Sequence, residues 1–320
     1  MARFLVTGGA GFIGSHLVRG VLAGGDRVRV LDDLSSGYSE NLSEVSDRVD
    51  FHRGDVSDPA AVSKAVDGVD YILHHAALAS VPRSVEDPWL NHRINVDGTL
   101  ALLMAARDSG VKRMVLASSA AIYGDDEISP KHEGLPPRPI SPYATSKLIG
   151  EQYCAQFTAC GWVSTVCLRY FNIFGPRQDP GSDYAAVVPI FLNTLLQGKA
   201  PVIYGDGGQT RDFTHVDNVV HANLLAVARD SAAGGVFNIG CGGSYSVNQL
   251  YERLSANLAP GVAARYVDTR AGDVRVSEAS IERARRELGY EVQTGFDEGL
   301  ESTCEWFRAH PDRARKGASA

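Results

Sequence analysis

Short apolar runs alternate with helix-like patterns over the first half of this chain. The apolar runs have the length and composition of buried strands and cover residues 4–7, 27–31, 49–53, 71–74, 114–118 and 164–170. Between them, helical patterns cover residues 12–23, 95–109 and 142–160. Because regular alternation of strands and helices builds a parallel sheet with helices on both faces, the pattern predicts a doubly wound α/β fold.

The pattern loosens after residue 172, where glycine and proline become frequent. Turn-forming residues gather at 175–176, 179–181 and 205–208, and they predict loops and short elements. Such a region suits a smaller C-terminal lobe that binds the substrate. A helical stretch within 213–228 and an apolar strand at 236–239 are expected to return to the main sheet.

These boundaries predict two coupled parts. The nucleotide-binding domain takes residues 1–171 and is rejoined by 212–240, while the lobe takes 172–211 and 241–308. A chain of 320 residues is long enough to give both parts a core. The tail at 309–320 is charged and rich in small side chains, so we expect it to be disordered.

The composition narrows the possible partners. Hydrophobic residues make up 44% of the chain and the net charge is −7 without a basic block, which gives nucleic-acid binding no support. The sequence shows neither a signal-peptide pattern nor an apolar run long enough to cross a bilayer. The five cysteines include no Cys-x-x-Cys pair, and their odd number argues against a disulfide framework or a zinc site. We therefore expect a cytoplasmic protein without a metal, nucleic-acid or membrane partner.

Three glycines separate the first predicted strand from the first predicted helix. Gly8, Gly11 and Gly14 form the spacing Gly-x-x-Gly-x-x-Gly. Glycine permits the tight turn, lets the backbone approach a pyrophosphate and allows helix and strand to pack closely. Because the first N–H groups of the helix then face the phosphates, this placement predicts a Rossmann-type dinucleotide site.

Two acidic positions extend the predicted dinucleotide site. Asp32 ends the second strand, where a carboxylate can accept hydrogen bonds from the adenosine ribose and would repel a 2′-phosphate. NAD is therefore favoured over NADP as the cofactor. Asp55 and Val56 end the third strand and are expected near the adenine ring, although a solvated loop aspartate is an equally good interpretation of Asp55.

Tyr143 and Lys147 form the pattern Tyr-x-x-x-Lys at the start of a predicted helix. Residues four apart share one helix face, so the phenol and the ammonium point the same way. A free tyrosine has a pKa near 10, and a nearby positive charge stabilises its phenolate. Ser118 and Ser119 end the preceding strand, at the edge where doubly wound folds place reactive groups.

Together these residues resemble the extended short-chain dehydrogenase/reductase family, and within it the nucleotide-sugar 4-epimerases. The resemblance extends from residue 3 to about residue 307. Besides Tyr143 and Lys147, it is carried by the runs TGGAGFIG at 7–14, HAA at 75–77, NVDGT at 95–99, SSAAIYG at 118–124, RYFN at 169–172 and RDF at 211–213.

The resemblance implies an oxidation and a reduction at C4 of a UDP-linked hexose. Tyr143 would take the proton of the C4 hydroxyl, and the C4 hydride would pass to NAD. The 4-keto sugar would turn over before the hydride returns to its other face, so NAD is regenerated in every cycle and stays bound. Ser119, Tyr143 and Lys147 are the catalytic residues that this implies.

The same resemblance names the binding residues. Cofactor contacts are expected at Gly8, Gly11, Phe12, Ile13, Gly14, Asp32, Asp55, Val56, Ala76, Asn95, Tyr143 and Lys147. Substrate contacts are expected at Ala79, Arg83, Ser119, Tyr143, Asn172, Val188, Tyr204, Arg211, Arg270, Asp273 and Ser277. Asn172 and Arg211 would hold the diphosphate, since a guanidinium binds phosphate through two parallel hydrogen bonds.

Ala120 and Ala121 separate this chain from two related groups of enzymes. The 4,6-dehydratases of the family carry Asp-Glu at these positions to eliminate water, and the uronate decarboxylases carry Glu at the second. Alanine moves no proton, whereas plain 4-epimerisation needs neither group. We therefore expect a 4-epimerase.

The preferred sugar stays open at this point. Ser277 matches a gate position that is bulky in glucose-only enzymes and small in broader ones, and Ala79 is also small. A roomy pocket admits UDP-N-acetylhexosamines, while Arg83 could meet the carboxylate of a uronic acid. UDP-glucose, UDP-N-acetylglucosamine and UDP-glucuronate all remain candidates.

Two other functions remain as alternatives. One is a reductase or dehydrogenase of 4-keto nucleotide sugars with dissociable NADP(H), which Asp32 disfavours. The other is a non-catalytic NAD-binding protein, which would leave Ser119, Tyr143 and Lys147 unexplained. By analogy with dimers of the family, the helices at 95–109 and 142–160 would pair across a two-fold axis, and we expect a homodimer.

Overall fold

A seven-stranded parallel sheet forms the centre of the protein. The computed structural model describes residues 1–180, 186–269 and 275–315. The strand order is β11-β6-β5-β4-β1-β2-β3, and every neighbouring pair is parallel. The strands are β1 (Arg3–Thr7), β2 (Arg27–Asp32), β3 (Val49–Arg53), β4 (Tyr71–His74), β5 (Arg113–Ser119), β6 (Ser164–Tyr170) and β11 (Val236–Ile239). The strand order reverses between β1 and β4, so the predicted Rossmann-type, doubly wound sheet is confirmed.

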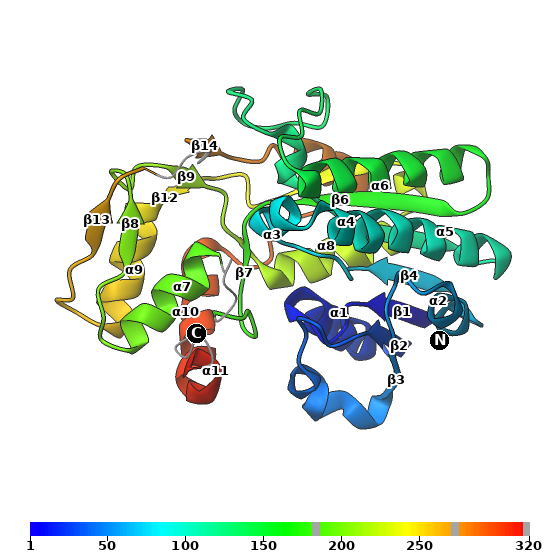
Figure 1. Cartoon of the computed structure of the whole chain (residues 1–320), viewed down its shortest axis with the longest axis horizontal. Coiled ribbons are helices and arrows are strands. Elements are labelled where there is room, and N and C mark those ends of the chain that lie inside the picture. Colours follow the sequence, from blue (N-terminus) through cyan, green and yellow to red (C-terminus); the bar gives the residue numbers. More distant parts are fainter. Residues whose placement is uncertain (181–185, 270–274, 316–320) are drawn as a thin grey trace.

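Helices cover both faces of this sheet (Figure 1). One face carries α1 (Phe12–Ala23) and α8 (Val216–Ala228), and the other carries α2 (Pro59–Val66), α5 (Gly98–Asp108) and α6 (Pro142–Ala159). Strand β1 shows how the sequence builds the two layers, because successive strand residues point to opposite faces. Phe4 and Val6 lie in the apolar cluster under α1, whereas Leu5 lies in the cluster under α5.

The helix predicted at 95–109 begins with an irregular turn. A π-helical turn (Arg93–Asp97) follows α3 (Val81–Glu86) and α4 (Pro88–His92) and leads into α5. Asn95 in this turn accepts the Leu78 N–H at 2.8 Å and donates to the Ser146 hydroxyl at 3.1 Å. These bonds tie the turn to the segment after β4 and to α6, which accounts for the local departure from α-helical geometry.

The C-terminal lobe has an apolar core of its own, seen at the left of Figure 1. Its helices are α7 (Val187–Leu196), α9 (Val247–Leu258) and α10 (Phe296–Ala309). Its short strands are β7 (Ile173–Phe174), β8 (Val202–Tyr204), β9 (Thr210–Arg211), β10 (Thr214–His215), β12 (Tyr245–Ser246), β13 (Arg265–Val267) and β14 (Val276–Ser277). Residues 212–240 also supply α8 and the edge strand β11, which pairs with β6.

The prediction of loops and short elements is wrong for the three lobe helices. Helix α9 starts with a capping box, in which the Ser246 hydroxyl and the Gln249 side chain each bond the other residue's backbone N–H. Behind this cap, Val247, Leu250 and Leu254 form a buried apolar stripe at helical spacing. The frequent glycines and prolines between the helices obscured a pattern that the sequence does contain.

The prediction of a disordered tail is wrong for residues 311–315, which form α11 (Pro311–Arg315). Proline suits the first turn of a helix because its missing N–H has no partner there. The Arg313 guanidinium lies 5.0 Å from the centre of the Tyr38 ring and donates to the Asn41 side chain at 2.8 Å. These long-range contacts order a segment whose composition alone gives no reason for a helix.

Candidate active site at the carboxyl edge of the sheet

The glycine-rich turn after β1 is built so tightly that no side chain fits into it. Gly8 has a φ of +68°, and a Cβ added there would lie 2.7 Å from the Ala76 backbone nitrogen. A Cβ on Gly14 would lie 2.0 Å from the Gly8 carbonyl oxygen. No described side chain caps the N-terminus of α1, so the amides of Phe12 and Ile13 are available to an anion.

The Asp32 carboxylate lies beside this turn at the end of β2. One oxygen accepts the Ala10 N–H at 2.9 Å and the other accepts the Leu34 N–H at 2.8 Å. Burial raises the pKa of Asp32, and the two backbone bonds oppose that shift. Each oxygen keeps a second acceptor position, so the carboxylate can receive further hydroxyl donors. The turn, the helix end and Asp32 together fit a dinucleotide.

The remaining predicted cofactor residues have definite places in the chain. The Asp55 carboxylate accepts the Ser57 N–H at 2.8 Å in a local turn after β3. Val56 is buried and packs against Gly98 at the start of α5. Ala76 lies against Gly8, whereas the Asn95 amide is engaged within the chain by Leu78 and Ser146.

Ser119, Tyr143 and Lys147 are brought together at the carboxyl end of β5. Ser119 is the last residue of β5, and its hydroxyl is hydrogen-bonded to the Tyr143 side chain. The Lys147 Nζ lies 5.8 Å from the centre of the Tyr143 ring and donates to the Ala117 carbonyl at 2.9 Å. Helix α6, which presents Tyr143 and Lys147, is capped by Ser141, whose hydroxyl accepts the Ala144 N–H.

Burial shifts the pKa values of both titratable groups toward their neutral forms. It raises the pKa of Tyr143, and the hydrogen bond with Ser119 only partly opposes the shift. It lowers the pKa of Lys147 to about 8, although the Glu151 carboxylate favours the charged ammonium. The chain by itself therefore holds Tyr143 as a phenol, and a phenolate there requires further positive charge nearby.

A buried polar network supports this face of α6, and the sequence analysis missed it. Glu151 accepts two hydrogen bonds from Arg169, at 2.9 and 2.7 Å, and one from the Ser118 hydroxyl at 2.6 Å. Arg169 also donates to the Tyr123 hydroxyl at 2.9 Å. The sequence did contain a signal for this network, because Glu151 lies four residues beyond Lys147 on the same helix face.

The sequence analysis also missed Ser84, whose hydroxyl accepts the Tyr143 N–H at 3.1 Å.

Three predicted substrate residues of the lobe share one small sheet and its border. Arg211 in β9 pairs with Ser277 in β14 and with Tyr245 in β12. The Asn172 side chain donates to the Asp212 carbonyl at 3.4 Å. The Asp212 carboxylate accepts three backbone N–H groups, yet burial raises its pKa to about 6. Asn172, Arg211 and Ser277 are thereby held as neighbours.

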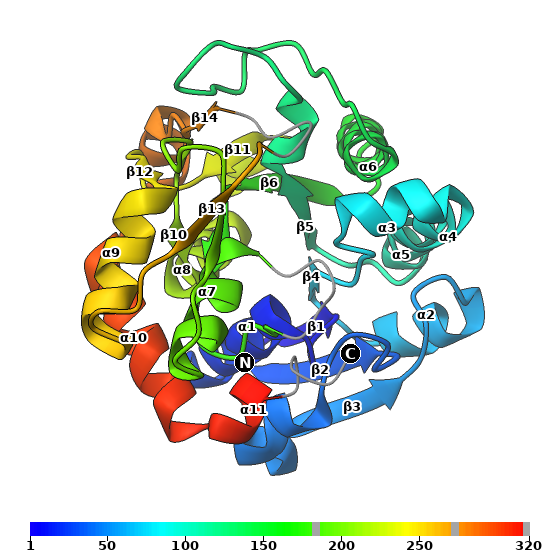
Figure 2. The same cartoon turned by 60° about the vertical axis from the view of Figure 1, so that its left-hand side comes forward.

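The other predicted substrate residues differ in how exposed they are. Ala79 and Arg83 are exposed near α3, and Tyr204 is exposed on β8. The Val188 side chain is only 2% exposed and belongs to the apolar core of the lobe. Arg270 and Asp273 lie outside the described residues. Figure 2 shows the lobe, with β13 and α7, in front of the central sheet.

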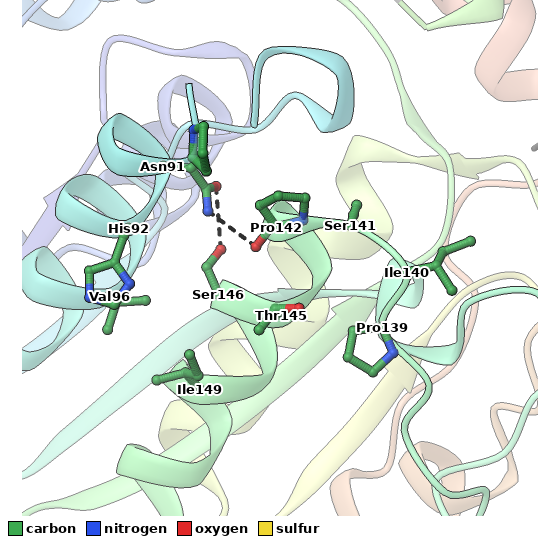
Figure 3. Close-up of a pocket in the computed structure, with 11 residues that line it drawn as sticks. Asn91, His92, Val96, Pro139, Ile140, Ser141, Pro142, Thr145, Ser146 and Ile149 are labelled. Carbon is green, nitrogen blue, oxygen red and sulfur yellow. Dashed lines mark hydrogen bonds between the residues drawn. The ribbon is translucent and has the colours of Figure 1, made fainter. Parts of the chain in front are cut away.

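A groove of about 510 Å³ lies on a different face of α6 (Figure 3). Its lining includes Val96, Ile140 and Ile149, and the Asn91 side chain donates to the Pro142 carbonyl at 3.1 Å. Neither Tyr143 nor Lys147 lines this groove, so it is separate from the candidate active site. Within the described ranges, no group of three histidine, cysteine or acidic side chains is arranged to hold a metal ion.

Comparisons with known proteins agree on one family. Residues 4–240 match the NAD dependent epimerase/dehydratase family. A UDP-glucose 4-epimerase of Mycolicibacterium smegmatis is 40% identical over 310 residues, which are 96% of this chain and 98% of that protein. The structure resembles the UDP-N-acetylglucosamine 4-epimerase from Methanobrevibacter ruminantium in complex with UDP-N-acetylmuramic acid, with a TM-score of 0.92, 38% identity, and coverage of 97% and 99% of the two chains. It also resembles the Thermus thermophilus UDP-glucose 4-epimerase in complex with NAD, with a TM-score of 0.86, 38% identity, and coverage of 96% and 99%.

The low pKa of Lys147 predicts a stability cost that depends on pH. The ammonium is fully charged in both states below about pH 8, where its burial destabilises the fold; the cost disappears as pH rises from about 8 to the unfolded value of 10.5. We expect Lys147→Met to raise the free energy of unfolding at pH 7 by up to about 3 kcal/mol, with a smaller difference at pH 10. Urea denaturation of nucleotide-free protein measures this. The prediction is contradicted if Lys147→Met gains less stability over the unsubstituted chain at pH 7 than at pH 10. Lys64→Met, at an exposed position, is the control.

Proposed function

The chain belongs to the NAD dependent epimerase/dehydratase family, and we propose that it inverts C4 of a UDP-linked hexose through the residues Ser119, Tyr143 and Lys147. The observation that carries this proposal is their meeting at the carboxyl end of β5, with Ser119 bonded to Tyr143 and Lys147 beneath the ring. The glycine-rich turn lies at the same edge of the sheet, after β1. A sugar at this edge would therefore be within reach of both the acid–base residues and the cofactor.

The residues present fit NAD, and each has a definite task. The amides of Phe12 and Ile13 would face the pyrophosphate, the three glycines would let it approach, and Asp32 would accept the ribose hydroxyls. A 2′-phosphate would be repelled by Asp32, which disfavours the alternative of a reductase with NADP(H). When bound, NAD supplies the acceptor and then the donor of the C4 hydride.

The chain's own residues move the proton of the C4 hydroxyl. Tyr143 removes it as the C4 hydrogen leaves, and returns it when C4 is reduced from the other face. The Ser119 hydroxyl shares the hydrogen bond with Tyr143 and orients the sugar hydroxyl. Lys147 keeps positive charge beside the ring, which lowers the energy of the phenolate during the transfer.

Two alanines explain why the reaction stops at C4. Ala120 and Ala121 start the turn (Ala120–Tyr123) after Ser119, and the Ala121 N–H donates to the Ser119 hydroxyl at 3.1 Å. Because neither side chain can move a proton, no acid or base at these positions assists the loss of water or carbon dioxide from the 4-keto sugar. The intact triad also argues against the alternative of a non-catalytic NAD-binding protein.

Tyr143→Phe removes only the phenolic oxygen, so we expect kcat to fall by about 10²- to 10⁴-fold while the fold is kept. Proton NMR of UDP-glucose, UDP-N-acetylglucosamine and UDP-glucuronate, with no added cofactor, measures turnover through the changed coupling between H3 and H4. Mass spectrometry of the product must show an unchanged mass. Tyr153→Phe on the same helix is the matched control and should retain full activity. Normal turnover by Tyr143→Phe would refute the catalytic assignment, and a lighter product would refute epimerisation.

We propose that the sugar pocket admits the N-acetyl group as well as plain hexoses. Ser277 and Ala79 are small, and Ser277 is held beside Arg211 by the pairing of β14 with β9. Filling this position with Ser277→Tyr is expected to reduce kcat/KM for UDP-N-acetylglucosamine at least about tenfold, with a smaller effect on UDP-glucose. Initial rates with both sugars measure the ratio. Equal losses for both would mean that Ser277 does not select the sugar, and a preference for UDP-glucuronate would instead point to Arg83.

We further propose a homodimer in which α5 and α6 pair with those of a second copy. The outer face of α6 carries the groove of Figure 3, and the neighbouring side chains of Trp89 and Ile140 are 83% and 61% exposed. Such apolar surface is typical of an interaction site. We expect light scattering at micromolar concentration to give a dimer and Ile149→Asp to give a monomer, with Ile190→Asp on α7 as the control. A monomeric unsubstituted protein contradicts this proposal.

A cytoplasmic location is also proposed. All five cysteines are free thiols, as is usual in a reducing compartment. The net charge of −7 further disfavours a nucleic-acid partner. Among the described helices, none is long and apolar enough to cross a membrane.

A further inference from the structure

The segment after β2 lies directly on the glycine-rich turn. A Cβ on Gly37 would lie 2.8 Å from the Ala10 carbonyl carbon and 3.0 Å from the Gly11 nitrogen. The Ala10 carbonyl accepts the Tyr38 N–H at 3.0 Å and the Asn41 side-chain amide at 2.8 Å. Any outward movement of residues 33–41 therefore breaks bonds with the turn that would bind the pyrophosphate.

Two segments distant in sequence hold this one in place. The Tyr38 hydroxyl donates to the Asp179 carboxylate at 2.8 Å, beyond β7. The Arg313 guanidinium of α11 stacks on the Tyr38 ring, with 5.0 Å to its centre, and donates to the Asn41 oxygen at 2.8 Å. Arg313 and Asn41 are 272 residues apart in the sequence. Asn41 is 2% exposed, so its amide links Arg313 to Ala10 through a buried side chain.

We propose that Tyr38, Asn41, Asp179 and Arg313 form a clasp that retains the dinucleotide, with Arg313 as its positioning residue. This inference rests on the proposed function only in that the glycine-rich turn must bind NAD. The clasp touches the back of the turn and contributes nothing to the chemistry. It slows release, because residues 33–41 directly follow Asp32, the predicted ribose ligand, and Arg313 restrains the movement of this segment from the end of the chain.

The clasp also explains the electrostatic arrangement around Tyr38. Burial and the Asp179 carboxylate raise the pKa of Tyr38 to about 12, while Arg313 acts in the opposite direction. The phenol thus stays protonated and remains a donor to Asp179 across the neutral range. The hydrogen bond from Tyr38, in the segment after β2, to Asp179 is therefore kept across this range.

The test measures cofactor exchange rather than turnover. Unsubstituted protein, Arg313→Ala and the control Arg308→Ala are loaded with NAD, mixed with excess isotope-labelled NAD and passed through gel filtration at intervals. Mass spectrometry then gives the fraction of original NAD that remains bound. We expect exchange about five- to tenfold faster for Arg313→Ala, since it loses a cation–π contact and a charged hydrogen bond, and no change for Arg308→Ala on α10.

Further variants keep the inference open to refutation. Tyr38→Phe preserves the ring under Arg313 but loses the bond to Asp179, so it should accelerate exchange to a smaller extent, and it carries the test if Arg313→Ala does not fold. The melting temperature of nucleotide-free protein distinguishes a purely structural role of these residues from a role in retaining NAD. A purely structural role lowers the melting temperature of the variants and leaves their NAD exchange unchanged. Equal exchange by all folded variants overturns the clasp, whereas an unsubstituted chain that binds no NAD overturns the proposed function instead.

Discussion

A buried ion pair between α6 and β6 fixes the geometry on which the candidate site depends. Glu151 and Arg169 are each about 5% exposed, and their two hydrogen bonds hold the helix at one rotation against the sheet. Tyr143, Lys147 and Glu151 follow at four-residue intervals, so the rotation that Glu151 requires also points the other two toward Ser119. Loss of either partner would leave a buried charge uncompensated, at a cost of about 3–5 kcal/mol. Ser118 extends the same constraint to β5.

The site contains groups that the fold would exclude if stability alone mattered. Lys147 is buried and donates to the Ala117 carbonyl, and its pKa falls to about 8. Asp212, which follows Arg211 in the chain, is fully buried, and its pKa rises to about 6 despite three backbone donors. Both shifts mean that solvent has been removed from groups that prefer it. In a water-excluded site, charge that develops on a sugar oxygen interacts strongly with such groups, which is the physical advantage of keeping them.

The sequence predicts the parts of this structure whose causes are local. Strand residues 71–74 and helix residues 12–23 have the predicted bounds, because the apolar run of the strand and the glycines before the helix are signals within the segments themselves. The pair of Glu151 and Arg169 could not be predicted in the same way, since its partners meet only when α6 is laid against β6 in one register. Helix α11 depends on Arg313 reaching Tyr38, and no local pattern contains that contact. Helix α9 was predictable, because the cap at Ser246 and the stripe behind it are local signals.

Helix α6 places the proposed chemistry and the proposed dimer contact on different faces. The face with Tyr143, Lys147 and Glu151 is polar, and Lys147 and Glu151 on it are buried. The face with Thr145 and Ile149 borders the groove and is partly exposed. Ser146 joins the two, since its hydroxyl accepts from Asn95 within the core and also lines the groove. A second copy that covered this apolar surface would therefore stiffen the helix without touching the residues proposed to move the proton, and the geometry of the candidate site would be set within each chain.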